Sequence, residues 1–283
     1  VIPFAIMLAP RPRRWISRLA LMAAGTLLAL AISPLINHRL LGASDSGVTH
    51  SQPLYDLAGI AVRAPADPLL PEGAALKAQH CVTPLYWDPL GQPPCDAITA
   101  RWQTLSTSAL VKSTIFAMAR HPGAYLVHRL RHLNSTERWL VPFGWPNARP
   151  VIANEPNKLG LTPPGRAAAI AQRTAATFAE TPLAWPICYV ILALAAFIAA
   201  LRNPARGPSH IAAALALSAL ALEASFGMIS IASDLRYHLW PMLASCLALA
   251  LLPADTLKQV AKPAGAGLAF VLMSGLAARL LLL

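Results

Sequence analysis

The chain has 283 residues, of which 56% are hydrophobic and only 12% are charged. Soluble domains carry about 25% charged residues, so this composition excludes an ordinary soluble globular domain and favours the membrane class. The formal net charge of +11 is expected to reflect Lys and Arg in cytoplasmic loops first. An anionic partner, such as lipid headgroups or a phosphate-bearing substrate, is the second explanation. Basic and aromatic residues do not interleave outside the membrane-flanking regions, so nucleic acid is not an expected partner.

Long apolar runs, taken in chain order, predict membrane-spanning helices, since about 20 apolar residues cross the hydrocarbon layer as a helix. The chain opens on Val1 with an apolar stretch to residue 9, which we expect to be the end of a span that begins upstream. Complete runs cover residues 15–36, 183–201, 210–232, 238–253 and 264–283. The expected fold class is therefore all-α, a polytopic transmembrane helix bundle with a large, mostly helical extracytoplasmic loop domain. The expected parts are membrane helices at 1–36, the loop domain at 37–182 and a four-helix membrane segment at 183–283.

The basic loops predict the orientation of these spans. Three loops carry the positive charge, at Arg11, Arg13 and Arg14, at Arg202 and Arg206, and at Lys258 and Lys262. They alternate along the chain so that all three can be cytoplasmic in one threading. Residues 37–182 then lie outside, and the expected location is the inner membrane of a bacterium.

The outer loop is too long and too rich in proline for a simple connection. It begins with a proline-dense stretch at 53–94. Helices are predicted at 97–119, at 122–133, where proline opens the first turn, and at 165–180. Residues 139–164 are expected to be irregular. Together these segments predict a small helical domain on the membrane surface.

Two of the four cysteines fall in the outer loop, at Cys81 and Cys95. An oxidising compartment favours a disulfide between them, which would stabilise a loop with little core of its own. Two unrelated thiols are the alternative, and a metal site is not expected because no paired C-x-x-C spacing is present. Cys188 and Cys246 fall in predicted spans and are expected to be packing residues.

A short outer turn between two predicted spans contains Asp234, Arg236 and Tyr237. Charges so near the hydrocarbon layer indicate a partner, a cavity or the interface. One interpretation is structural, with Asp234 and Arg236 paired at the start of the next helix. The other is that Arg236 binds a lipid-linked phosphate or its sugar, since a guanidinium matches phosphate oxygens in a bidentate way.

The predicted helix at 122–133 is basic and amphipathic, and Arg120 precedes it. Four polar side chains share one face: Tyr125, His128, Arg129 and His132. Three leucines form the opposite stripe: Leu126, Leu130 and Leu133. Such helices lie in membrane interfaces. Simple surface anchoring is one hypothesis, and a pocket wall for an anionic headgroup, with Arg120, His128 and Arg129 in contact, is the other.

Acidic residues offer candidates for proton transfer. No spacing distinguishes a pair among the outer carboxylates, which are Asp45, Asp56, Asp67, Glu72, Asp88, Asp96, Glu137, Glu155 and Glu180. Asp56 is a weak catalytic candidate, because its apolar context would raise its pKa on burial. Glu223 lies inside a predicted span, where an acid indicates a functional site. It would act as a proton or cation site, or else be a protonated residue bonded to Ser218 or Ser225.

The turn Asp234-Leu235-Arg236-Tyr237, followed by a span containing proline, resembles the late outer loop of bacterial membrane glycosyltransferases of the GT-C superfamily. The segment from Tyr55 to Ile60 and the helix with His128 and Arg129 also resemble outer loops of such proteins. The resemblance implies a polyprenyl-phosphate sugar as donor, contacted by Arg236 and Tyr237. The family's usual catalytic acid lies in a first outer loop that this sequence does not show, so the resemblance assigns no catalytic base.

The expected function is therefore transfer of a sugar from a polyprenyl-phosphate donor to an extracytoplasmic acceptor in envelope glycan synthesis. Membrane lipid and the lipid-linked sugar are the expected partners, and the sequence demands no cofactor and no metal. One alternative is a carrier or flippase for a lipid or small solute that uses Glu223. Another is a non-catalytic envelope assembly protein.

Overall fold

The structure, a computed structural model, describes residues 15–44, 47–85, 88–148, 160, 165–203 and 208–282. All regular secondary structure in these segments is helical, which confirms the all-α prediction. Two helices within them are long and apolar enough to cross a membrane, α10 (Ser209–Ile229) and α12 (Ala254–Leu281). Several predictions fall outside the described residues, namely the apolar segment 1–9, the acids Asp45 and Glu155, and the basic residues Arg11, Arg13, Arg14 and Arg206.

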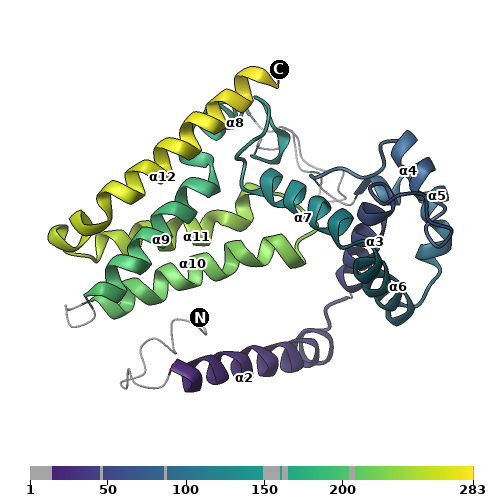
Figure 1. Ribbon diagram of the computed structural model, residues 1–283, viewed down its shortest axis with the longest axis horizontal. Helices are drawn as coiled ribbons and strands as arrows, with labels where there is room; N and C mark the ends of the chain where they lie inside the picture. The colour runs from purple at the N-terminus through teal and green to yellow at the C-terminus, as the bar shows by residue number, and fades with distance from the viewer. Residues whose placement is uncertain are drawn as a thin grey trace.

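Four helices, which we call the bundle, pack together in the C-terminal part: α9 (Pro186–Arg202), α10, α11 (Leu239–Ala250) and α12 (Figure 1). Within the bundle, α10 packs against α9 and α11, and α9 packs against α11 and α12. Their shared core is mostly alanine: Ala193, Ala195, Ala196, Ala199, Ala200, Ala212, Ala213, Ala216, Ala219, Ala244 and Ala248. Side chains this small let helix backbones approach closely, as in helix pairs inside membranes.

The last helix begins earlier than the sequence suggested. We expected a span at 264–283 and a basic loop before it, but α12 starts at Ala254, so Lys258 and Lys262 lie within the helix. Pro253 precedes the first turn in an extended conformation, and Asp255 lies in that turn. An acid in the first turn of a helix interacts favourably with the helix dipole, which helps this segment begin at Ala254.

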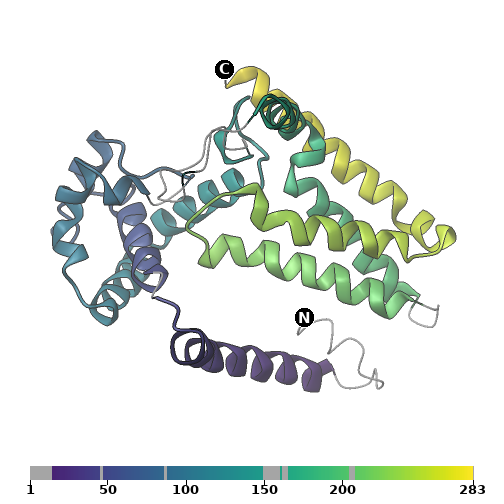
Figure 2. The same cartoon turned by 180° about the vertical axis from the view of Figure 1, so that it is seen from behind.

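Five helices form a second unit, which we call the cap: α3 (Val48–Ala61), α4 (Gly73–Ala78), α5 (Cys95–Gln103), α6 (Thr107–Arg120) and α7 (Pro122–Thr136). Their core contains larger side chains than the bundle core, including Tyr55, Ile60, Leu76, Trp102 and Leu110. α7 packs against α3 and α6 on one side and α10 on the other. It therefore joins the cap to the bundle, as Figures 1 and 2 show from opposite sides.

The single helix predicted at 97–119 is wrong, because the segment forms two helices. α5 ends at Gln103 and α6 begins at Thr107. Ser106 lies between them in an extended conformation, and its hydroxyl accepts a hydrogen bond from the Ala109 backbone N–H at 3.3 Å. A serine at this position caps a new helix start, which explains the break.

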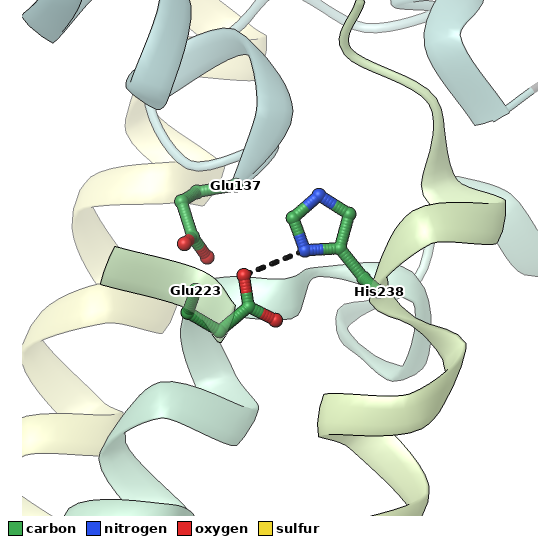
Figure 3. Close-up of side chains that lie close together, drawn as sticks. All are labelled: Glu137, Glu223 and His238. Atoms are coloured by element: carbon green, nitrogen blue, oxygen red, sulfur yellow. Dashed lines mark hydrogen bonds and ion pairs between the residues drawn. The ribbon is translucent and has the colours of Figure 1, made fainter. Parts of the chain in front are cut away.

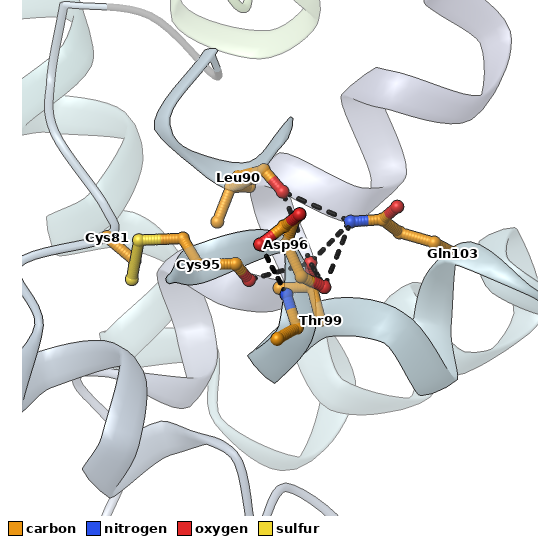
Figure 4. Close-up of a disulfide and its surroundings, with 7 residues drawn as sticks. Cys81, Leu90, Cys95, Asp96, Thr99 and Gln103 are labelled. Atoms are coloured by element: carbon orange, nitrogen blue, oxygen red, sulfur yellow. Dashed lines mark hydrogen bonds between the residues drawn. A yellow bond between two sulfur atoms is a disulfide. The ribbon is translucent and has the colours of Figure 1, made fainter. Parts of the chain in front are cut away.

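The predicted disulfide between Cys81 and Cys95 is present and ties the segment after α4 to the first residue of α5 (Figure 4). Both cysteines are buried. Next to the bridge, the Thr99 hydroxyl donates to the Cys95 carbonyl at 3.1 Å, and Gln103 Nε2 donates to Thr99 Oγ1 at 2.7 Å. The disulfide therefore closes a part of the cap that has few helical residues. Cys188 and Cys246 are free thiols in the bundle.

The C-terminal end of α12 is bonded to the segment that follows α7. Arg279 is buried, and its guanidinium donates to the backbone carbonyls of Arg138 at 2.9 Å and Trp139 at 3.0 Å. The same guanidinium lies 3.7 Å above the ring of Trp185, which precedes α9. This contact fixes the position of residues 137–139 relative to the bundle.

Two further α-helices lie outside the bundle and the cap, and the remaining helical segments of the described chain are short π or 3-10 turns. α2 (Trp15–Pro34) lies apart from the bundle in both ribbon views (Figures 1 and 2). Its leucines are exposed, among them Leu27, Leu28 and Leu30. α8 (Arg166–Ala179) matches the helix predicted at 165–180 and leads into α9.

Candidate functional site

A cavity of about 570 Å³ lies at the junction of cap and bundle, between α7, α9 and α10. Most of its wall is apolar: Leu130, Leu133, Leu140, Ile187, Val190, Leu220 and Ala224. The polar exceptions include two acids, Glu137 and Glu223. An apolar cavity with a few convergent polar groups is the usual form of a small-molecule site.

The two acids meet a histidine at this junction (Figure 3). Glu137 follows the last turn of α7, Glu223 lies on α10, and His238 ends the short helical turn η5 (Leu235–His238) that leads into α11. His238 Nδ1 lies 2.7 Å from Glu223 Oε2. One ligand-type atom from each residue lies within 4.8 Å of the other two. We call these three residues the Glu137 cluster.

The Glu137 cluster is almost inaccessible to solvent, with exposed fractions of 5% for Glu137, 4% for Glu223 and 0% for His238. Each residue retains an atom that makes no hydrogen bond with the described residues: Glu137 Oε2, Glu223 Oε1 and His238 Nε2. Burial raises the pKa of Glu137 well above its ordinary value, and the charge of Glu223 adds to this rise. Burial also lowers the pKa of His238 to about 4. The group is thus suited to accept a proton or to hold a cation.

Contacts across the junction hold the turn that carries His238. The Ser233 backbone N–H donates to the Leu85 carbonyl at 2.8 Å. The Ser233 hydroxyl lies 2.9 Å from the hydroxyl of Ser135 on α7. The imidazole of His238 packs against the ring of Phe226 on α10, with centroids 4.6 Å apart. The turn is therefore fixed from three directions, and the imidazole is positioned before any ligand binds.

Three of the sequence-predicted candidates come together in a separate cluster inside the cap. Arg129 Nη2 lies 2.5 Å from Asp56 Oδ2, and His128 Nε2 lies 3.3 Å from Asp56 Oδ1. Arg129 Nη1 also donates to the Ser230 carbonyl, at the end of α10, at 2.6 Å. All three side chains are buried. Gly59 makes this packing possible, because a Cβ there would lie only 2.3 Å from His128 Nδ1.

The polar and apolar faces of α7 contain the predicted residues. The polar face points into the protein and the apolar face outward, the opposite of what a soluble cap with a surface-anchoring basic helix would show. His128, Arg129 and His132 point into the cap, while Leu126 and Leu130 are more than half exposed. The basic face is not available for anchoring because it pairs with the acid of α3 and with backbone carbonyls of the cap and of the segment after α10. Asp56 additionally lines a second cavity of about 470 Å³ between α3 and α6.

Four other sequence-predicted candidates, Asp234, Arg236, Tyr237 and Arg120, lie in two further ion-paired groups. Arg236 Nε lies 3.0 Å from Asp234 Oδ2, with side chains 70% and 40% exposed, and the guanidinium stacks 5.2 Å from the centroid of the Tyr237 ring. The Asp234 carboxylate also accepts from the Arg236 backbone N–H, so the structural pairing that we expected is present. Arg120 Nε lies 3.0 Å from Asp67 Oδ2. These residues lie outside the Glu137 cluster.

Of the predicted site residues, Glu223 alone belongs to the Glu137 cluster. Its expected partners are wrong, since the Ser218 hydroxyl accepts from Trp240 Nε1 and the Ser225 hydroxyl donates to the Leu222 carbonyl. Glu137 and His238 were not selected from the sequence. Glu137 was one of many outer acids, and His238 stood beside the more conspicuous Arg236. The available signal was position alone, because Glu137 directly follows α7 and His238 directly precedes α11.

Comparison with known proteins finds no match to this chain among protein-family models, curated proteins or solved structures. Function must therefore be argued from the chemistry of the site, since a helical fold by itself is compatible with many activities. The relevant facts are an apolar cavity, two buried acids and a fixed imidazole at one junction.

Proposed function

We propose that the protein is a multi-pass protein of the bacterial inner membrane that transfers a sugar from a polyprenyl-phosphate donor to an extracytoplasmic acceptor. The observation that carries this proposal is the cavity at the junction of cap and bundle, whose wall is apolar except for a few groups that include Glu137 and Glu223. Apolar walls suit a lipid chain, and a buried carboxylate suits the removal of a proton from an acceptor hydroxyl.

The membrane location is supported by three features. α10 and α12 are long and apolar enough to cross a bilayer, and α9 is a further apolar helix of 17 residues. Exposed leucines along α2 suit a lipid environment. The disulfide between Cys81 and Cys95 favours an oxidising compartment for the cap, which agrees with an extracytoplasmic position.

The proposed reaction assigns Glu137 as the general base. The acceptor oxygen attacks the anomeric carbon of the sugar, and its proton passes to the Glu137 carboxylate. The bond between the anomeric carbon and the phosphate oxygen breaks, and the polyprenyl phosphate leaves with the bonding electrons. Glu137 suits this role because it lines the cavity and its Oε2 has no hydrogen-bond partner among the described residues, so an acceptor oxygen in the cavity can approach it.

Arg236 and Tyr237 remain the proposed contacts for the donor phosphate. They lie in the same turn as His238, and the Arg236 side chain is exposed, so a phosphate can reach it. A guanidinium that is already oriented by Asp234 loses less conformational freedom on binding. This arrangement would hold the charged group outside the cavity and the reacting sugar near Glu137.

The test is transfer of label from a radiolabelled polyprenyl-phosphate sugar in membranes that carry the protein. Glu137→Gln keeps the size of the side chain but removes the base, so transfer is expected to fall about 100-fold or more. Arg236→Ala is expected to weaken donor binding. Glu72→Gln is the matched control, since Glu72 pairs with Arg101 in the cap and does not line the cavity. Equal transfer by wild type and Glu137→Gln, at equal protein level, would contradict the assignment.

A carrier is the second candidate function, because Glu223 lies within a helix long enough to span a membrane and is paired there with His238. An acid in such a position often couples transport to protons or cations. If no donor supports transfer, and Glu223→Gln abolishes cation-dependent uptake of a lipid or solute into vesicles, the carrier replaces the transferase. If the wild type shows neither transfer nor uptake, a non-catalytic assembly protein is left.

A further inference from the structure

The Glu137 cluster brings two buried carboxyl groups together with no lysine or arginine paired to them in the described chain. Two carboxyl groups with exposed fractions of 5% and 4% lie side by side. No lysine or arginine of the described chain forms an ion pair with either one, and His238 is the single basic neighbour within hydrogen-bond distance. Buried charges in proteins are paired, protonated or bound to metal ions, because an isolated buried charge is too costly.

We propose that Glu137, Glu223 and His238 bind one divalent transition-metal cation, with open coordination positions facing the cavity. This inference concerns the ion alone and does not rest on the proposed transfer of sugar. Glu137 serves as the base of that transfer only in the metal-free protein, so bound Zn²⁺ is expected to inhibit the transfer. Two carboxylates and one imidazole supply three protein ligands, which is the number found in open zinc sites where a water or another ligand takes the fourth position.

The donor set discriminates between classes of ion. Ca²⁺ takes roughly six to eight oxygen ligands, more than this group offers, and Mg²⁺ retains water and prefers oxygen donors. An imidazole nitrogen beside two carboxylates suits Zn²⁺ and its first-row neighbours, and among these Zn²⁺ has no redox chemistry and commonly takes three protein ligands in an open tetrahedral site. Zn²⁺ is therefore the probe that the residues fit best.

The geometry is close to what a bound ion needs. Ligands about 2.0–2.2 Å from a tetrahedral zinc lie about 3.4 Å from one another. The candidate atoms of the three residues already lie within 4.8 Å of one another, and Glu223 and His238 are in direct contact. His238 faces the acids with Nδ1, which already contacts Glu223 Oε2, and Glu137 Oε2 and Glu223 Oε1 have no hydrogen-bond partner among the described residues, so movement of the two carboxyl groups by about 1 Å breaks few existing contacts.

The surroundings hold the group in place. Phe226 packs on the imidazole, and the bonds of Ser233 to Leu85 and Ser135 fix the turn from which His238 extends. Glu137 precedes Arg138, whose carbonyl is held by Arg279. Residues around the ligands that restrict their movement raise metal affinity, because less ordering is needed on binding.

The experiment is equilibrium dialysis of the purified, untagged full chain in detergent against Zn²⁺, with bound metal measured by atomic absorption. Wild type is expected to bind one Zn²⁺ per chain. Glu223→Gln and His238→Phe each remove one ligand and should weaken binding at least about tenfold. The controls are His80→Asn and Asp96→Asn, a histidine and an acid of the cap that lie outside the cluster, and both should bind as wild type does.

A second measurement needs no substitution and therefore does not depend on whether the variants fold. X-ray absorption of the zinc-loaded wild type should show oxygen and nitrogen ligands with one imidazole and no sulfur. Sulfur in the ligand shell would place the ion at Cys188 or Cys246 and overturn the inference. The inference also fails if wild type binds no Zn²⁺, or if both folded ligand variants bind it as tightly as wild type.

Discussion

The cap and the bundle reach stable packing by different means. The cap core combines large apolar side chains with a buried pair of charges, Asp56 and Arg129, and with a disulfide. The bundle core is mostly alanine. A small unit with short helices gains its shape from specific pairs and a cross-link, whereas long apolar helices gain theirs from close backbone approach. Substitutions that remove a specific pair should therefore damage the cap, and substitutions that add volume should damage the bundle.

The largest effect is expected when the buried charge pair of the cap is broken. Arg129→Met leaves Asp56 buried without its guanidinium partner, which should cost about 3–5 kcal/mol of stability. The measurement is thermal unfolding of the purified protein together with protease resistance of the cap. Arg131→Met is the matched control, because Arg131 is exposed on the same helix, and it should change stability by less than about 0.5 kcal/mol.

The double substitution Asp56→Leu with Arg129→Met sharpens this test. It removes both charges, so much of the lost stability should return, since a buried ion pair can be replaced by apolar residues at little cost. If Arg129→Met alone unfolds no more easily than Arg131→Met, the pair does not stabilise the cap.

Removing the disulfide is the next effect in size. Cys81→Ser with Cys95→Ser should destabilise the cap by about 3 kcal/mol, because the unfolded chain gains the freedom that the bridge removed. Urea unfolding followed by protease cleavage of the cap measures this loss. Cys246→Ser, at a free and exposed thiol of the bundle, should leave the midpoint unchanged. An equal shift in both proteins would show that the loss is not specific to the bridge.

Added volume should damage the bundle. Ala216 on α10 is fully buried among the other alanines, so Ala216→Leu forces the helices apart and should cost about 1–3 kcal/mol. Ala221→Leu makes the same change at an exposed position of the same helix and should have little effect. Thermal unfolding in detergent compares the two. Similar midpoints would mean that the alanine core tolerates a larger side chain and is not closely packed.

The smallest effect is a dependence of cap stability on mild acid. Burial lowers the pKa of His132 to about 3, and the nearby charge of Arg129 lowers it further. His128, His238 and Tyr55 of α3 also lie near the His132 imidazole. The unfolded chain therefore binds a proton at His132 below about pH 6.5 when the folded chain does not. The free energy of unfolding is therefore highest above about pH 6.5. It falls as the pH drops, by about 1.5 kcal/mol between pH 6.5 and 5.

His132→Asn tests this pH dependence. The Asn amide can replace the contact of His132 Nδ1 with the Pro84 carbonyl but does not titrate, so part of the loss in acid should disappear. The measurement is unfolding of both proteins at several values of pH from 7 to 5. His80→Asn, at an exposed histidine, should retain the slope of wild type. An unchanged slope in His132→Asn would assign the acid sensitivity to another group.

The sequence predicted the helices well where an apolar run or a proline marked them, and it predicted the disulfide. It predicted which side chains of α7 share a face, but not that His128 and Arg129 point inward. Spacing defines the two faces of a helix, whereas their direction depends on partners such as Asp56, far away in the chain. The Glu137 cluster was missed for the same reason, since Glu137 and Glu223 become neighbours only through the packing of α7 against α10.

The bond between Arg279 and the segment after α7 has a consequence for the order of assembly during synthesis. The carbonyls of Arg138 and Trp139 receive their donors from a helix that follows every other described helix in the chain. While the ribosome is still making α12, these carbonyls lack the Arg279 guanidinium, and Glu137 beside them lacks the support that this contact gives. The cap can form early, but its acidic junction with the bundle is completed last.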